Sequence, residues 1–572
     1  MYRHLKRRFR ADFNTYEELL HACIRDGNIP ELRALLHSNH ARISYIHPGF
    51  GAPLHYAATL GDLDAIELLL AAGADLFLLS SGDSSLTAIG CAAREGHRDA
   101  VARLWAAATP EDQLRNITPG RQSLIVAAMY GRAAIVCDLL SCWHGWPLQL
   151  KYTALLWAAR RWHFEVAYLL INTVDFGKDK LDEALSYAVK KKTELPDEFR
   201  SRCEGFEYSN QQSLIASLID AGAAPNSTCD GMPLLCYAAE DANLTGALRV
   251  LLEKGADPNT CSEMGRSALH MVAGAVAQGQ IDRPVVNETA IRLLIHHHAS
   301  VSQSDEDGET PLHTAAFGVD LRLLRLYLSA CGNTEEQQAL LFAKTHREET
   351  LLHFAAAGGC FETISFLISQ GLDVNARNVN GWTPLMCALV LVDGGSLRTS
   401  LVTKPPDTAI QAARCLLSLG ADATIQTDEG WTALHCLALY CHYDFCDRAS
   451  AFTKELLSHG ANPHAEAVLL RRVFAAGPSS GMPWGWRLGE AMVNPEKFQM
   501  VASPKMPVLS WAAERGALGV LRALLTHGVD ASYMDGDGLT PTRLAVESPF
   551  LKQKPELADR IVTLLLETGA GF

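Results

Sequence analysis

The chain has 572 residues, of which 48% are hydrophobic, and a formal charge of −14 at pH 7. This apolar content is sufficient for a large buried core, and the acidic balance argues against general binding to nucleic acid or to anionic membranes. The longest apolar run, 384–392, ends at Asp393 and is too short to cross a bilayer, so we expect no membrane partner.

The cysteines indicate a reducing compartment. Fifteen are present, an odd number, and most lie at expected helical positions, where Cys serves as a small apolar residue. No Cys-x-x-Cys pair occurs in the sequence. We therefore expect free thiols in a protein located inside the cell.

A basic leader at residues 1–15 precedes the first predicted element. Its five cations are Arg3, Lys6, Arg7, Arg8 and Arg10. They run into polar residues and not into an apolar segment, which argues against a secretory signal peptide. Three interpretations stay open: a nuclear address, a phosphate-binding arm and a solvated chain end.

The pattern Gly-Glu-Thr-Pro-Leu-His-Thr-Ala-Ala at residues 308–316 returns along the chain. Thr310 is suited to cap a helix, and Pro311 fits the first helical position because it needs no amide hydrogen there. We therefore expect a helix to begin at Pro311 and at the matching position of each related stretch. The related stretches are residues 52–58, 267–270, 350–356, 381–385 and 430–435.

A glycine follows an Ala-Ala pair at several places along the chain, as at Gly61 and Gly96. Glycine readily takes the left-handed conformation that ends a helix. A second apolar helix is expected next, for example 65–70, followed by another glycine at residue 73. Trp162 stands at the glycine position of one repeat. Because a bulky residue is strained there, we expect that helix to end differently.

This pattern resembles the ankyrin repeat, a unit of roughly 33 residues that consists of a turn and two antiparallel helices. The resemblance implies an all-α ankyrin-repeat solenoid of about 14 helix-turn-helix units. We place these units at residues 16–463, beginning with a degenerate N-terminal cap, and at 508–572. Shorter insertions are expected near 190–211, 276–287 and 393–407.

A longer insertion is expected at 464–507. It is rich in Gly and Pro and contains Trp484 and Trp486. Residues 469–474, at its start, are interpreted as the remnant of a first helix. Because insertions in solenoids form loops on one face and often carry function, this segment is a candidate lid over a binding groove.

Motifs that would indicate chemistry are weak. Residues 477–481 match Gly-x-Ser-x-Gly, but the strand and helix that a nucleophile elbow needs are not expected around them. A zinc-type cluster has Cys-x4-Cys-x4-Cys spacing and lacks close ligand pairs, and the consecutive histidines 296–298 point in different directions. We therefore expect no catalytic residue, no metal and no cofactor. The zinc-type cluster comprises His435, Cys436, Cys441, His442, Asp444 and Cys446.

The resemblance implies binding to proteins through hairpin tips and the inner helix surface. Trp382 and Trp431 share one non-consensus position in adjacent repeats, and Trp is enriched in interface hot spots. The alternative is that both indoles pack between hairpins inside the protein. Polar residues at neighbouring tips complete the predicted partner-binding site: Arg377, Asn378, Asn380, Asp428, Glu429, Asp305, Glu306, Asp307 and Glu309.

The sequence thus favours a non-enzymatic protein-interaction scaffold or adaptor, with contact centred on residues 305–435. The alternative is an acquired small-ligand or enzymatic role that uses residues 464–507 as a lid. We expect protein partners, no direct contact with nucleic acid, and a cytoplasmic location, with the nucleus left open by the basic leader.

Overall fold

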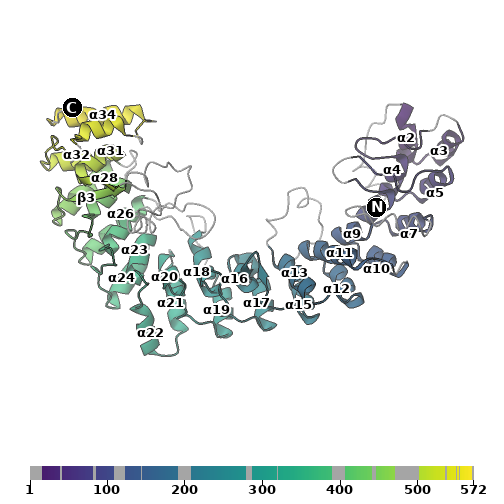
Figure 1. Cartoon of the computed structure of the whole chain (residues 1–572), viewed down its shortest axis with the longest axis horizontal. Helices are drawn as coiled ribbons and strands as arrows, with labels where there is room; N and C mark the ends of the chain where they lie inside the picture. Colours follow the sequence, from purple (N-terminus) through teal and green to yellow (C-terminus); the bar gives the residue numbers. More distant parts are fainter. Residues whose placement is uncertain are drawn as a thin grey trace. The chain divides into compact units, whose positions relative to one another are not determined.

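The structure is a computed structural model with two compact units. The first comprises Met1–Ala238 and Asn243–Asp257, and the second Ala239–Ala242 and Pro258–Phe572. Figure 1 labels many of the helices along the chain. The leader at 1–15 lies outside the described residues. The residues that the structure describes are 16–38, 42–81, 85–108, 123–142, 145–190, 208–278, 287–318, 320–389, 406–440, 446–470, 502–534, 538–548, 551–552 and 554–569.

The helices of the first unit follow one another in pairs. We call the first helix of each pair the inner helix and the second the outer helix. The inner helices are α2 (Leu19–Asp26), α4 (Pro53–Leu60), α6 (Ala88–Glu95), α9 (Ser123–Met129), α11 (Leu148–Arg160), α13 (Lys178–Val189) and α16 (Leu234–Ala239). The outer helices are α3 (Ile29–Leu36), α5 (Leu63–Ala71), α7 (Arg98–Ala106), α10 (Ala133–Cys142), α12 (Phe164–Thr173), α15 (Tyr208–Asp220) and α17 (Thr245–Glu253). Short elements are the 3-10 turns η1 (Tyr16–Glu18) and η3 (Ala242–Leu244) and the strands β1 (Thr228–Cys229) and β2 (Met232–Pro233).

The second unit repeats the same plan, and each of its inner helices packs on the next. The inner helices are α18 (Ala268–Gln278), α20 (Pro311–Phe317), α23 (Leu351–Gly358), α25 (Pro384–Leu389), α27 (Ala433–Tyr440), α31 (Val508–Arg515) and α33 (Pro541–Glu547). The outer helices are α19 (Glu288–His296), α21 (Leu321–Ser329), α24 (Phe361–Ser369), α26 (Pro406–Ser418), α28 (Cys446–Ser458), α32 (Leu518–Thr526) and α34 (Pro555–Glu567).

The prediction of an all-α array of helix pairs is therefore confirmed. Seven pairs stand in each unit within the described ranges. The inner helices are slim, which lets neighbouring repeats approach closely. A side-chain carbon added at Gly358 of α23 would lie 2.0 Å from the carbonyl oxygen of Phe317 in α20. None of the described helices has the length and apolarity that a membrane crossing requires.

The ends of the inner helices follow the expected glycine rule. Gly61 and Gly96 have φ of 71° and 90°. The prediction for Trp162 is wrong, because this residue takes the same left-handed conformation, with φ of 57°. Its indole is only 1% exposed and lies 5.4 Å from the ring of Tyr208. Burial of this large apolar surface offsets backbone strain of about 1–2 kcal/mol.

Two elements depart from the sequence prediction. Residues 469–470 are not helical but belong to the strand β3 (Glu466–Leu470), which pairs antiparallel with β4 (Ala502–Pro507). The partner strand supplies the hydrogen bonds that the sequence alone could not reveal. An additional helix, α22 (Thr334–Leu341), follows α21 and was not predicted. The predicted insertion at 276–287 begins within α18, and residues 471–501 lie outside the described ranges.

Candidate interaction surface

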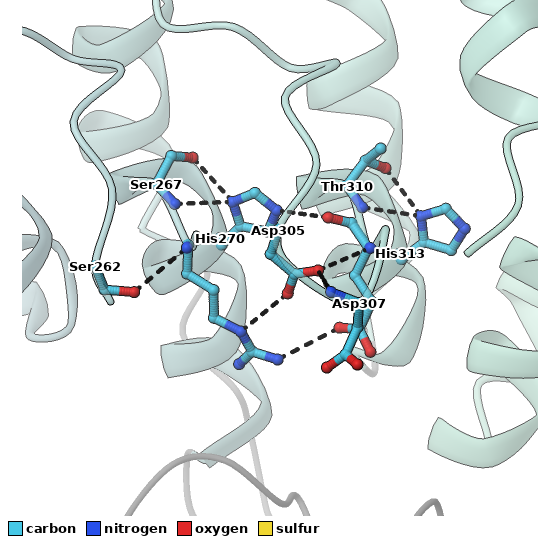
Figure 2. Close-up of polar contacts among 9 residues, drawn as sticks. Ser262, Ser267, His270, Asp305, Asp307, Thr310 and His313 are labelled. Atoms are coloured by element: carbon cyan, nitrogen blue, oxygen red, sulfur yellow. Dashed lines mark hydrogen bonds and ion pairs between the residues drawn. The ribbon is translucent and has the colours of Figure 1, made fainter. Parts of the chain in front are cut away.

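A histidine in the first turn locks several inner helices to the next repeat. In α18, the Ser267 amide donates to Nδ1 of His270 at 3.1 Å, and Nε2 lies 3.0 Å from the Glu309 carbonyl oxygen (Figure 2). His353 repeats this arrangement with the Thr350 amide and the Trp382 carbonyl. Since Nδ1 accepts, Nε2 carries the proton, and the ring is neutral. Burial lowers the pKa of both rings to about 4.

The hairpin turns before α20 and α25 are each closed by a side chain at the first residue of the turn. The Asp305 carboxylate accepts hydrogen bonds from the amides of Asp307 at 3.0 Å and Glu309 at 2.8 Å (Figure 2). Asn378 does the same for the amides of Asn380 and Trp382, at 3.0 and 2.9 Å. Predicted site residues Asp305 and Asn378 therefore shape the turns. Both side chains stabilise the turns, but neither is exposed on the surface of the tips.

Backbone hydrogen bonds join one hairpin tip to the next. We define the tip row as the turns 262–266, 305–309, 345–349, 378–382 and 427–431. The Glu306 amide donates to the Met264 carbonyl at 3.2 Å, and the His346 amide donates to Asp307 at 2.9 Å. The Val379 amide donates to the Arg347 carbonyl at 3.0 Å, and the Asp428 amide donates to the Asn380 carbonyl at 3.5 Å. The five tips consequently form one ordered row within the second unit.

The last residue of each turn forms a second row beneath the tips. It begins as an ionic cluster, because Arg266 lies 3.2 Å from Asp305 and 3.4 Å from Glu309. Burial raises the pKa of the Glu309 carboxyl to about 7, although the charge of Arg266 acts in the opposite direction. Burial likewise raises the pKa of Glu349 to about 7, while Asn378 donates to this carboxylate at 3.2 Å.

The row continues with Trp382 and Trp431, which are buried. They are 6% and 0% exposed, their ring centroids lie 5.7 Å apart, and Trp431 meets Trp511 edge-on at 4.5 Å. This matches the internal-packing alternative. The prediction that the two indoles contact a partner is corrected accordingly, because neither offers surface area. The sequence does not distinguish the two roles, since aromatic area serves both.

The other predicted site residues are distributed over the tip row. Glu306, Asp307 and Asp428 are exposed, whereas Asn380 and Glu429 are half-buried. Arg377 is exposed and forms an ion pair with Asp428 at 3.3 Å. The structure therefore brings the predicted polar residues together on neighbouring tips.

Family models match three parts of the chain. Ankyrin repeats in three copies match residues 19–114 and 54–149, ankyrin repeats in many copies match 352–390, and a single ankyrin repeat matches 429–467. Ankyrin repeat and SOCS box protein 16 of Homo sapiens is 32% identical over 192 residues, which are 33% of this chain and 37% of that protein. The chain is an ankyrin repeat protein.

Further relatives of this ankyrin repeat protein differ in kind. NF-kappa-B inhibitor delta of Mus musculus is 29% identical over 226 residues, which are 36% of this chain and 62% of that protein. L-asparaginase of Dirofilaria immitis is 30% identical over 156 residues, which are 27% of this chain and 23% of the enzyme. The chain thus matches less than two thirds of the length of each relative.

The ankyrin tip row also presents apolar side chains that the sequence analysis missed. Met264 and Val379 are 47% and 52% exposed, each at the outer end of its turn. Met264 directly precedes the turn glycine Gly265, and Val379 lies two residues before Gly381. This position in the turn is the sequence signal that could have identified them. They add apolar area to a surface that is otherwise mainly acidic.

The weak chemical motifs gain no structural support. Residues 477–481 lie outside the described ranges, as do Cys441, His442 and Asp444. His435 is fully buried and bonded to Thr432 at the start of α27, as expected for the repeat histidine. Within the described residues, no group of three His, Cys, Asp or Glu side chains is placed to hold a metal ion.

Proposed function

We propose that this chain is a non-enzymatic protein-interaction scaffold whose partner contact is centred on the tip row between residues 305 and 431. The observation that carries the proposal is the backbone ladder from Met264 to Asp428, which fixes the tips relative to one another before a partner binds. A preordered surface loses little conformational entropy on association. The ankyrin family supports protein binding in general terms, and the location of contact is our proposal.

The exposed side chains of the tip row favour a basic partner segment with an apolar residue. Glu306, Asp307 and Asp428 present negative charge, and Val379 presents apolar area between them. Arg377 and Asp428 partly neutralise each other through their ion pair, so Glu306 and Asp307 carry most of the unpaired negative charge. Charge complementarity of this kind accelerates association and excludes partners of the wrong sign.

The test reverses charge at two tips. Glu306→Lys/Asp428→Lys should reduce capture of partner proteins from cell lysate by at least about tenfold, because two attractive contacts become repulsive. Captured proteins are identified and quantified by mass spectrometry with the full chain as bait.

A matched variant separates tip chemistry from net charge. Glu253→Lys/Glu335→Lys changes the same number of exposed carboxylates, away from the tips on α17 and α22. Its captured set should equal that of the unchanged chain. Undiminished capture by the tip variant would remove the tip row as the contact centre.

Two further hypotheses from the sequence, the lid and the cellular location, remain proposals. The small-ligand or enzymatic role depends on a lid at 464–507, most of which lies outside the described residues. We also propose a location inside the cell, supported by the thiols. Cys23 and Cys91, for example, are buried thiols outside any disulfide.

A further inference from the structure

Alternating aromatic and cationic side chains run across three neighbouring inner helices of the first unit. Helix α11 packs between α9 and α13 and supplies the middle of the run. Trp157 and Arg160 lie one turn apart on α11, so both face the same side, and Lys190 directly follows the end of α13. We name these six residues the cation–aromatic ladder: Tyr130, Arg161, Trp157, Arg160, Tyr187 and Lys190.

The distances make the ladder continuous at its exposed end. The guanidinium carbon of Arg160 lies 5.7 Å from the ring centroid of Trp157 and 5.9 Å from that of Tyr187. Nζ of Lys190 lies 5.3 Å from the Tyr187 ring. All three separations fall within the range of cation–π attraction, about 6 Å. The rings therefore hold both cations in place.

The two ends of the ladder differ in burial. Arg161 is 1% exposed and donates to the Met129 carbonyl at 2.9 Å, so its role is structural. Trp157, Arg160, Tyr187 and Lys190 are each half-buried and can contact a ligand.

The cations at the exposed end retain charge that a ligand can use. In the part of the chain that the structure describes, Arg160 forms no ion pair with a carboxylate, and aromatic rings hold it instead. Lys190 pairs with Asp230 at 3.1 Å, but the Asp230 side chain is 78% exposed. An exposed pair of this kind contributes little free energy and exchanges readily with a competing anion.

We propose that the exposed end of the ladder binds an acidic linear peptide segment that carries an apolar side chain. Carboxylates of the peptide would bond to Arg160 and Lys190, which are positioned in advance by the rings. The apolar side chain would lie against Trp157 and Tyr187. A nucleic acid offers similar anionic chemistry, but its affinity depends on neutralising many phosphates, and the exposed end of the ladder supplies only two cations, Arg160 and Lys190. The surface lies in the first unit and does not depend on the tip-row proposal.

The experiment measures fluorescence anisotropy of labelled peptides of about twelve residues with the full chain. The probes are a Glu-Asp-Leu repeat, a Lys-Arg-Leu repeat and a single-stranded DNA of equal length. The acidic peptide should bind at least about tenfold more tightly than the other two, and Arg160→Glu/Lys190→Glu should weaken its binding by at least about tenfold.

The matched control is Lys151→Glu/Lys178→Glu, which changes the same net charge on α11 and α13 outside the ladder. This control should retain binding of the acidic peptide. If the charge-reversed ladder variant does not fold by circular dichroism, Arg160→Gln/Lys190→Gln replaces it with the same expected loss. Equal losses in the ladder and control variants, or preference for DNA or the basic peptide, would overturn the proposal.

Discussion

Glu348 takes a backbone conformation that glycine occupies in neighbouring turns. Its φ is 62°, compared with 79° for Gly308 and 77° for Gly381. A side chain in this region approaches the following carbonyl oxygen and costs about 1–2 kcal/mol. The Glu348 side chain pairs with Lys344 at 2.6 Å, but both side chains are about half exposed and the pair stabilises the fold little. The turn is therefore strained, because a residue other than glycine takes the left-handed conformation at position 348.

Glu348→Gly should raise the free energy of unfolding by about 0.5–1 kcal/mol. The relief of strain exceeds the extra entropy that glycine gives the unfolded chain. Urea unfolding followed by circular dichroism measures the change.

Trp162→Gly provides the contrast, because Trp162 has a similar φ of 57° but a buried indole. Its loss should destabilise the protein by about 3 kcal/mol or more, since a cavity outweighs the strain relieved. If both variants were destabilised equally, backbone strain at Glu348 would not be the deciding factor.

Buried ionisable side chains lie where each hairpin meets its inner helix. Their contributions to the stability of the fold change with pH in opposite directions. Burial holds the pKa of His353 near 4, so this ring stays neutral and its contribution to stability is lost as pH falls below about 6.5. Burial raises the pKa of Glu309 and Glu349 to about 7, so each binds a proton more tightly in the folded state than when unfolded. Their contribution is full at acidic pH and is lost as pH rises through about 7.

Glu309→Gln/Glu349→Gln should therefore be more stable than the unchanged chain at pH 8, by about 2 kcal/mol for each substitution. This advantage should shrink as pH falls and vanish near the ordinary carboxyl pKa of about 4.5. Thermal unfolding at several pH values measures the difference.

Glu335→Gln on α22 is the control, because this exposed carboxyl does not lie at a hairpin junction. It should give no stability difference that depends on pH. A difference that does not change with pH would argue against a raised carboxyl pKa at Glu309 and Glu349.

The helix pairs could be predicted from sequence because their signals are local. Pro311 at a helix start and Gly61 at a helix end act within one turn of chain. The roles of Trp382 and Trp431 could not be predicted, since burial depends on what the next repeat places against them. Strand β3 was missed for the same reason, because its partner strand is separated from it by residues 471–501.

At the scale of the whole molecule, each unit is a stack in which a repeat contacts its sequence neighbours. Stability of such arrays is approximately a sum of repeat and interface contributions. The tip row is the part of the second unit where this stacking reaches the exposed turns, through backbone bonds such as those donated by His346 and Val379. The proposed scaffold function depends on this row being ordered in the free protein.

Amide hydrogen exchange of the free chain at single-residue resolution tests that dependence most directly. The amides of His346 and Val379 donate to the preceding tip, whereas the Met264 amide forms no hydrogen bond within the described residues. The account predicts exchange at His346 and Val379 at least about a hundredfold slower than at Met264. Exchange at all three amides at the rate of an unstructured peptide would contradict an ordered tip row.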